Sequence, residues 1–468
     1  MKTRKGYKVY PLTAAQKLHF YYQQYCPKKQ VLNIGSYLAI EVDLDFDLLK
    51  ECVYTAYERC DSMRLRFAKD KDGQTYQYVI KKEERDIEFF DFTGWAMADA
   101  KKLLDDWTAV PFEKYDAPQN RIVMIKLPDG FQGLYMVVDH MTMDAQSVIP
   151  FFKDIIELYG YQKYPDAGLE YPKEMSSYKK QLEKDLAYEA GTPAKKRDAQ
   201  FFEKLISSSE PIFNGIDGPA SLEEERRKEN NPNYRAVTVV SDNVDSNLST
   251  FHLEAEPSMQ LLDFCGEHKI SMTCLLLMGL RTYLQKENHE EDVSLVTTVA
   301  RRATLAEKYS GGTRIHCFPF RTIVPESDSF MEGLYKVRDG QNQLFRHANY
   351  DPVEYYRFRS EYYHLKPGQT YEPFSLTYQP LTMKDKGLER LGDIKYRSER
   401  CNNGAAAHNL YLTVSHRSED NGLEFCFEYQ TGVVSHQKLE YIYYYLCKIL
   451  FEGIRDPGKS VGEIIAAV

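Results

Sequence analysis

The sequence predicts an α+β protein built from two lobes. In residues 1–175, segments whose apolar residues have helical spacing alternate with segments whose apolar residues have strand spacing. A polar stretch punctuated by prolines follows, and it crosses to the second lobe at about 189–235. Beyond it, strands and helices return in an order that loosely repeats the first series. Because both series mix the two periods, we place the lobes at 1–175 and 176–468.

The first lobe ends in a hairpin and a helix. The strands 121–126 and 133–139 are expected to pair through Pro-Asp-Gly at 128–130, which is a turn signal. Pro150 lies inside the following helix and is expected to kink it or to mark a start close by. The predicted helices of this lobe are 12–25, 46–60 and 145–162. The predicted strands are 36–43, 64–67, 75–80, 87–90, 121–126 and 133–139.

The polar stretch from about 170 to 233 is predicted to hold a helix at 175–188. Little apolar periodicity follows Phe213, so a mobile segment is expected near 222–232. The strands predicted for the second lobe are 250–255, 293–298, 374–378, 409–414 and 423–429. Its predicted helices are 257–268, 271–285 and 437–454.

Composition excludes several classes of function. A formal charge of −9 argues against general binding to nucleic acid, which requires concentrated Lys and Arg. The basic clusters at 195–197 and 226–228 are interpreted as solvated surface, with an acidic partner or cofactor phosphates as the alternative. The nine cysteines show no Cys-x-x-Cys pair and no zinc spacing, so we predict no metal site. Without a signal peptide or a membrane span, the protein is expected in the cytoplasm, where thiols stay reduced.

His140 and Asp144 are the candidate site in the first lobe. They lie between the buried strand 133–139 and the helix that follows. Side chains on a loop of this kind are oriented by the rigid strand and helix on either side, and they remain accessible. A histidine placed there can act as a base in acyl transfer. The structural interpretation makes Asp144 the N-cap of the helix and His140 an ordinary buried histidine, and the local sequence leaves both open.

Six segments in order resemble the motifs of a known family. The central one, Asp139-His-Met-Thr-Met-Asp-Ala145, resembles the His-His-x-x-x-Asp-Gly motif of the condensation domains of nonribosomal peptide synthetases. These domains belong to a superfamily of thioester-dependent acyltransferases that includes chloramphenicol acetyltransferase. Each match alone is weak, but six in the same order are specific. The segments are 11–21, 57–67, 139–145, 298–302, 312–321 and 349–354.

The resemblance implies two chloramphenicol acetyltransferase-like lobes in a V-shaped pseudo-dimer, with an active-site tunnel at their junction. Donor and acceptor thioesters would enter the tunnel from opposite faces. His140 takes the catalytic position. Asp144 becomes structural and pairs with Arg301 or Arg302 across the lobe junction. Possible tunnel-lining residues, by their place in the resemblance, are His316, Ser375 and Tyr378.

The chain departs from the family motif at three places. Asp139 replaces the first histidine, and a carboxylate there is expected to favour the imidazolium form of His140, which weakens a base. Ala145 replaces the glycine and adds a methyl group where the backbone approaches substrate. The segment 312–321 resembles a loop of the family that contains an Asn-Thr pair, and this pair is His316-Cys317 here. We interpret His316 as a change of shape rather than as a second catalytic group.

The implied function is acyl transfer in natural-product biosynthesis. His140 would take or position the proton of an acceptor amine or hydroxyl, and backbone N–H groups around Ala145 would bind the oxyanion. The sequence contains no adenylating domain and no serine motif that accepts phosphopantetheine. We therefore expect a free-standing protein that uses a separate acyl or peptidyl carrier protein, or coenzyme A. Acyl-phosphopantetheine or acyl-coenzyme A would be a substrate, a small molecule the acceptor, and no cofactor would stay bound.

Two other functions remain open. The changes at Asp139 and Ala145 are of the kind expected in a catalytically eroded module that recruits partner proteins. Retention of His140 and Asp144 favours catalysis. The second alternative is a coenzyme A-dependent O-acyltransferase, which would use the same histidine to make an ester instead of an amide.

Overall fold

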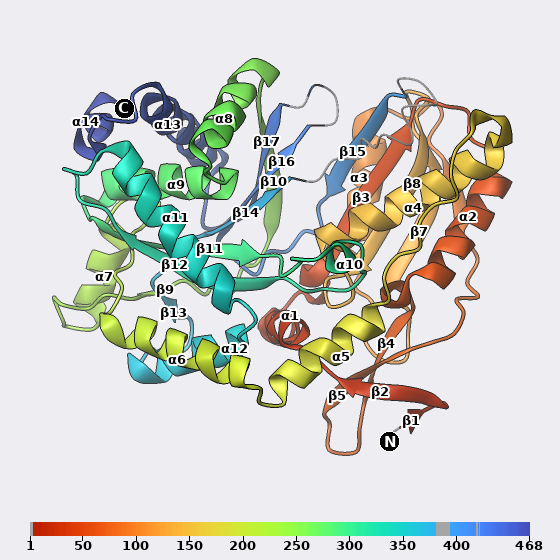
Figure 1. Cartoon of the computed structure of the whole chain (residues 1–468), viewed down its shortest axis with the longest axis horizontal. Helices are drawn as coiled ribbons and strands as arrows, with labels where there is room; N and C mark the ends of the chain where they lie inside the picture. The colour runs from red at the N-terminus through yellow and green to blue at the C-terminus, as the bar shows by residue number, and fades with distance from the viewer. Residues whose placement is uncertain (1–2, 381–393, 418–419, 421) are drawn as a thin grey trace. The chain divides into compact units, whose positions relative to one another are not determined.

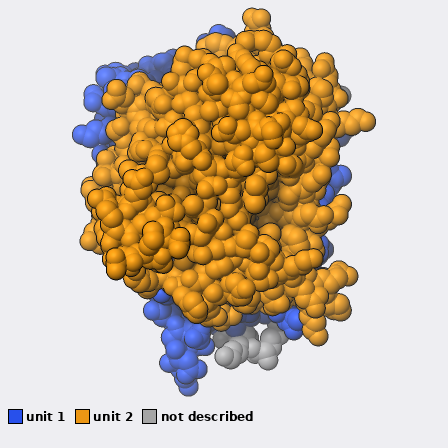
Figure 2. All heavy atoms as spheres, turned by 90° about the vertical axis from the view of Figure 1, so that its left-hand side faces the viewer, with its two compact units in different colours: residues 1–192, 300–315, 381–405 blue, residues 193–299, 316–380, 406–468 orange. Residues whose placement is uncertain are grey.

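The computed structural model describes residues 3–380, 394–417, 420 and 422–468 (Figure 1). The chain has a mixed α+β fold and divides into two compact units. Unit 1 consists of residues 1–192, 300–315 and 381–405, and unit 2 of residues 193–299, 316–380 and 406–468; they are coloured separately in Figure 2. The segment 300–315, which the sequence division assigns to the second lobe, packs within unit 1. Arg301 and Arg302 therefore belong to the same unit as His140.

The larger sheet of unit 1 ends at the candidate site. Its strand order is β15-β3-β8-β7-β6, and β7 and β8 form the predicted antiparallel hairpin, with Lys126 opposite Gln132. Every residue of β8 is buried, so the strand before the site lies inside the core. The strands are β15 (Tyr396–Cys401), β3 (Asn33–Ile40), β8 (Gln132–Asp139), β7 (Asn120–Lys126) and β6 (Glu88–Asp91). A second sheet contains β1 (Thr3–Arg4), β2 (Tyr7–Pro11), β5 (Thr75–Val79) and β4 (Leu65–Lys69).

Helices cover both faces of the larger sheet. Phe151 of α4 packs with Val53 of α2 and Met136 of β8 in one core, whereas Leu104 of α3 packs with Tyr135 in another. Successive residues of a strand point to opposite faces of the sheet, so the adjacent residues Tyr135 and Met136 belong to different cores. The helices are α1 (Ala14–Tyr25), α2 (Phe46–Arg59), α3 (Met97–Thr108), α4 (Ala145–Lys163), α5 (Tyr178–Glu189) and α10 (Leu305–Lys308). Short 3₁₀ turns are η1 (Lys29–Leu32), η2 (Asp61–Arg64) and η3 (Pro165–Ala167).

Unit 2 is built around a six-stranded sheet of order β10-β17-β16-β14-β11-β12. Its strands are β10 (Ser246–Leu253), β17 (Leu423–Gln430), β16 (Leu410–His416), β14 (Ser375–Gln379), β11 (Asp292–Val299) and β12 (His316–Ile323). A small sheet pairs β9 (Val237–Thr238) with β13 (Gln369–Thr370). The helices are α6 (Pro193–Ser208), α7 (Ala220–Lys228), α8 (Ala255–His268), α9 (Met272–Asn288), α11 (Phe330–His347), α12 (Pro352–Tyr362), α13 (His436–Arg455) and α14 (Val461–Ala467).

Helix α9 is apolar on most sides because it lies in the core of unit 2. Gly279 permits close packing there, since a Cβ atom at this position would lie 2.7 Å from methyl carbons of Leu446 and Leu450 on α13. Among the described residues, neither α9 nor another helix has the length and apolar character needed to cross a membrane.

The expectation of a mobile segment at 222–232 is wrong for its first part, which is helical in α7. Leu222 and Glu225 are buried, and Glu225 accepts a hydrogen bond of 2.8 Å from the Thr238 hydroxyl. The sequence signal is weak because only one narrow face of this highly charged helix is covered. The stretch 312–321, expected as a loop, becomes strand β12 from His316 onward.

Candidate active site

The loop that carries His140 is held by hydrogen bonds at both ends. Strand β8 ends at Asp139 and helix α4 begins at Ala145. The His140 N–H donates to the carbonyl of Leu32 at 2.8 Å. At the other end the Asp144 N–H donates to the Ser147 hydroxyl at 2.9 Å. The position of His140 is therefore set by the sheet, by η1 and by the first turn of α4, as expected for a side chain aimed by rigid flanks.

His140 is partly exposed, but its Nδ1 atom is buried and has no hydrogen bond of good geometry with the described residues. Burial lowers the pKa of His140 below 6.5 because it disfavours the charged imidazolium. Backbone groups of His140 and Met143 act in the opposite direction, as do the carboxylates of Asp144 and Asp139, without outweighing burial. A neutral imidazole at pH 7 is the form that can accept a proton.

Asp139 favours the imidazolium form of His140, as expected, but burial of the ring outweighs this effect. Asp139 is fully buried, and its Oδ2 atom lies 3.2 Å from Lys114 Nζ. Its Oδ1 atom accepts a hydrogen bond of 2.8 Å from the Met141 N–H. The carboxylate thus has a cation and a backbone donor of its own, which reduces its influence on the neighbouring ring.

Asp144 pairs with Arg302, one of the two arginines expected. Nη2 of Arg302 lies 2.9 Å from Oδ1 and 3.0 Å from Oδ2 of the carboxylate. The Arg314 N–H donates to Oδ2 at 2.9 Å, and the Ser147 hydroxyl donates to Oδ1 at 3.0 Å. With these donors around it, Asp144 holds the segment 300–315 against α4. That the role of Asp144 is structural stays a prediction.

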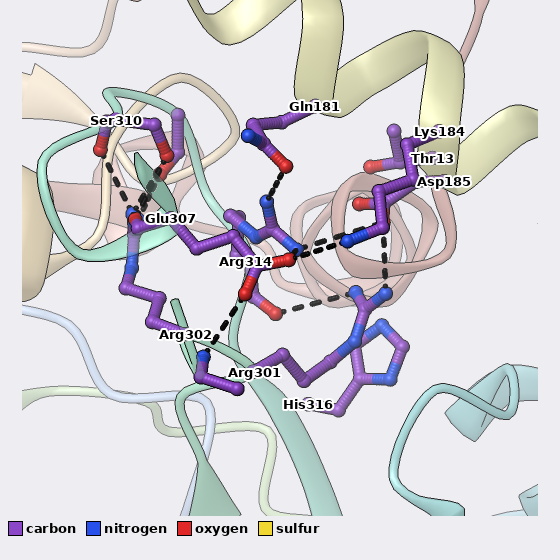
Figure 3. A network of polar contacts seen from close by, with 12 residues as sticks. Thr13, Gln181, Lys184, Asp185, Arg301, Arg302, Glu307, Ser310, Arg314 and His316 are labelled. Carbon is purple, nitrogen blue, oxygen red and sulfur yellow. Dashed lines mark hydrogen bonds and ion pairs between the residues drawn. The ribbon is translucent and has the colours of Figure 1, made fainter. Parts of the chain in front are cut away.

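Arg301 binds a different carboxylate, that of Asp185 on α5, at 3.0 Å (Figure 3). Arg314 approaches the same carboxylate to 3.7 Å and donates to the Gln181 side chain at 2.8 Å. The backbone of Arg301 has φ +54°, an uncommon conformation for a residue other than glycine. The turn at this point sends two adjacent arginines to separate partners.

The possible tunnel-lining residues all lie in unit 2. His316 is fully buried, and its Nδ1 atom forms a hydrogen bond of 2.9 Å with the Ala348 carbonyl. This bond fixes the ring and supports the interpretation of a change of shape. Ser375 is buried on β14, and the Tyr378 hydroxyl lies 2.7 Å from Nε2 of His416. That they line a tunnel stays a prediction.

Several residues around His140 were missed from the sequence. His19 stacks on the His140 ring, and Gln16 and Gln23 on the same helix bind the neighbouring loop atoms. Their spacing of three and four residues along α1 is a signal that could have found them, because it places all three on one helix face. Lys114, the partner of Asp139, carries no comparable signal, since only the fold brings it near.

A cavity of about 250 Å³ in unit 2 is separate from these residues. It lies among α6, α11, α12 and β12 and contains none of the predicted site residues. Its two arginines already bind carboxylates: Arg321 binds Asp292 and Arg359 binds Glu372. The candidate active site remains the loop at His140.

Comparison with known proteins assigns the family. Residues 7–466 match the Condensation domain family, which is nearly the whole chain. The chain belongs to the condensation domain family. Members of this family are in general acyltransferases that form amide bonds. The six sequence segments were therefore interpreted correctly as a resemblance to condensation domains.

The relatives of this condensation domain are large synthetases. The chain is 22% identical over 466 residues to surfactin synthase subunit 1 of Bacillus subtilis (strain 168), covering 97% of this chain and 12% of the relative. It is 22% identical over 455 residues to bacitracin synthase 3 of Bacillus licheniformis, covering 97% of this chain and 7% of that relative. The chain thus spans less than a fifth of the length of these relatives.

Solved condensation domains share the fold. The first condensation domain of the calcium-dependent antibiotic synthetase, in complex with a substrate analogue, superposes with a TM-score of 0.78 at 18% identity, covering 97% of this chain and 98% of that one. The starter condensation domain of rhizomide synthetase, in complex with C8-CoA, gives 0.79 at 17% identity, with 97% of each chain covered. The X-domain from teicoplanin biosynthesis gives 0.72 at 16% identity, with 99% and 98% covered.

Proposed function

We propose that this condensation domain transfers an acyl or aminoacyl group from a thioester to an amine or hydroxyl acceptor, in the biosynthesis of a natural product. The donor is the phosphopantetheine arm of a separate carrier protein, or coenzyme A. The observation that carries the proposal is His140, partly exposed on a loop fixed at both ends, with a pKa that burial lowers. A synthetase domain of the same fold was solved with C8-CoA, which supports an acyl thioester as the donor.

In the proposed reaction the nitrogen or oxygen of the acceptor attacks the carbonyl carbon of the thioester, and His140 takes the proton that this atom loses. The carbon–sulfur bond breaks, the sulfur leaves as a thiolate, and the proton on His140 is returned to it. The first N–H groups of α4, on Ala145 and Gln146, have no acceptor within the helix, as at any helix start. They are the proposed donors to the oxyanion of the tetrahedral intermediate.

The geometry favours catalysis over a docking role. An eroded site would have no need of a partly exposed histidine with a carboxylate bound by Arg302 and Arg314 beside it. Asp139, the main departure from the family motif, is paired with Lys114, and its effect on the pKa of His140 is outweighed by burial. The V-shaped arrangement, the tunnel and the lobe boundaries at 175 and 176 remain parts of this proposal.

The test assays the purified chain with thioester donors of two kinds, acyl-coenzyme A and acyl-N-acetylcysteamine, against amine and alcohol acceptors side by side. Products are identified by mass spectrometry. His140→Ala is expected to lower turnover by about 10²- to 10⁴-fold, the usual contribution of a general base. His252→Ala is the matched control, since this half-exposed histidine lies in unit 2.

Equal turnover by the His140→Ala variant would overturn the catalytic proposal. The docking alternative would then be tested by a search for protein partners that bind the wild-type chain. Product formed with alcohols and not with amines would replace amide formation by the O-acyltransferase alternative.

A further inference from the structure

A second imidazole lies against the ring of His140. His19, on α1, is 5% exposed, and its ring stacks on that of His140 with the ring centroids 4.0 Å apart and the planes inclined by 22°. One face of His140 is therefore covered by an aromatic ring instead of by water. Removing water from a titrating group disfavours its charged form.

Helix α1 holds the loop on both sides of His140. Nε2 of Gln16 donates to the Met141 carbonyl at 3.1 Å, and Nε2 of Gln23 donates to Oδ2 of Asp139 at 3.4 Å. His19 lies between them in the sequence. Residues three and four positions apart share one face of a helix, so one face of α1 contacts the residue before His140, the ring itself and the residue after it.

The helix that carries His19 is itself fixed. Gln16 is fully buried, and its Oε1 atom accepts a hydrogen bond of 2.9 Å from the Thr13 N–H at the helix start. The amides of Gln16 and Gln77 also bind each other reciprocally, at 2.8 and 2.6 Å. The bonds with Gln77 anchor the first turn of α1 to strand β5 of unit 1. The His19 ring is thus presented by a rigid support.

We propose that His19 is a positioning residue for acyl transfer, which holds the His140 ring in one plane and keeps water from one of its faces. The inference rests on the proposed function, because it concerns the same site. It assigns the effect to the stacked ring and not to proton transfer by His19. A phenyl ring at this position can replace the stack, whereas a methyl group cannot.

The carboxylates that act on the pKa of His140 within unit 1 include those of Asp139 and Asp144. Each carboxylate has a cation of its own: Lys114 lies 3.2 Å from Asp139, and Arg302 lies 2.9 Å from Asp144. Substitution of His19 removes none of these pairs. A change in the pKa of His140 in a His19 variant therefore reports on the stacked ring.

The test compares His19→Ala with His19→Phe in the full chain. The pKa of His140 is measured by NMR titration of the histidine ring signals, which are assigned from their loss in His140→Gln. In His19→Ala the pKa of His140 is expected to rise toward 6.5, and kcat to fall about 10-fold or more with KM nearly unchanged, as for a misplaced base. In His19→Phe both quantities stay near the wild-type values.

Unchanged His140 pKa and kcat in His19→Ala would overturn the proposal. It would also be overturned if His19→Phe lost as much activity as His19→Ala while the pKa of His140 stayed low, because the imidazole and not the stack would then matter. Tyr21→Ala is the control and should change neither quantity, because Tyr21 of α1 is 50% exposed. Thermal unfolding checks that each variant is folded.

The titration requires no acyl donor, which separates the two proposals. A wild-type chain that turns over no thioester counts against the proposed function. The pKa of His140 in the two His19 variants still decides whether the stacked ring controls this residue.

Discussion

Nη2 of Arg302 lies 2.9 Å from one carboxylate oxygen of Asp144 and 3.0 Å from the other, and both side chains are 1% exposed. Nη1 of the same arginine binds the carbonyls of Glu307 and Ser310, at 2.7 and 2.8 Å. This arginine ties the segment 300–315 to the start of α4, where the candidate site lies. The carboxylate of Asp144 is thus bound within unit 1 by residues of the segment 300–315.

The first prediction concerns this pair. Asp144→Ala should lower the free energy of unfolding by about 3–5 kcal/mol, because it leaves the Arg302 guanidinium buried without its carboxylate. Urea denaturation measures the change. Glu224→Gln, which breaks a surface pair with Lys228, is the control and should leave stability nearly unchanged. An Asp144→Ala variant as stable as the control would mean that the loop carbonyls alone hold Arg302.

Much of the fold could be predicted from periodicity, whereas side-chain partners could not. The hairpin of β7 and β8 and the helix from Ala145 were expected, because a buried strand and an amphipathic helix each have a distinct spacing. The pairing of Asp144 with an arginine was expected too. Which of the two arginines it binds could not be predicted, because adjacent residues of the turn at 301–302 point to different partners only in the folded chain.

Helix α7 was missed because its apolar pattern is weak, whereas α3 and α11 were missed although each buries residues along one face. Helix α7 buries Leu222 and Glu225 among charged neighbours, so its pattern resembles that of an unstructured segment. The net direction of the pKa shift of His140 could not be predicted from the sequence. The sequence shows Asp139 beside it, but burial and the Lys114 partner of Asp139 arise only in the folded chain.

The second prediction concerns pH. Burial holds the pKa of His140 below 6.5, so the base is neutral at pH 7 and is lost as the pH falls through that lower pKa. The value of kcat/KM should therefore be flat near neutrality and fall only below pH 6.5. Asp139→Asn removes a group that raises this pKa and should move the fall to still lower pH. A fall centred above pH 6.5 would contradict the prediction.

The third prediction concerns Gly312, whose carbonyl accepts hydrogen bonds from Arg302 and Ser147. The residue has φ +94°, and a Cβ atom would lie 2.1 Å from ring carbons of Tyr178. Gly312→Ala should therefore cost more stability than Gly130→Ala, where φ is +89° and nothing lies within 4 Å. The control should lose about 1–2 kcal/mol, the cost of a left-handed residue with a side chain.

Denaturant unfolding of the two glycine variants measures this difference. A loss in Gly312→Ala no greater than in Gly130→Ala would show that the Tyr178 ring moves aside freely. If the ring does not move, the displaced Gly312 carbonyl also weakens the contact of Arg302, and turnover should fall together with stability.

The last prediction concerns Glu307, at the start of α10. Burial alone would raise the pKa of Glu307, but the hydrogen bond from Lys184, the Thr304 N–H and the charge of Arg314 lower it to about 2. Its ordinary pKa is 4.5, so the folded protein holds the charged form more strongly than the unfolded chain does. The stabilisation is present above pH 4.5 and is lost as the pH falls through 2. By linkage it amounts to about 3 kcal/mol.

Glu307→Gln keeps the shape of the cap and removes the charge. It should be less stable than the wild type at pH 7, and the difference in stability between the two should shrink as the pH falls from about 4.5 to 2, where the wild type loses this contribution. Glu332→Gln is the matched control, because Glu332 makes the same capping box with Ser329 on the exposed start of α11. Without a buried arginine beside it, Glu332 should contribute less. Equal losses in the two variants would show that capping, and not the charge facing Arg314, accounts for the role of Glu307.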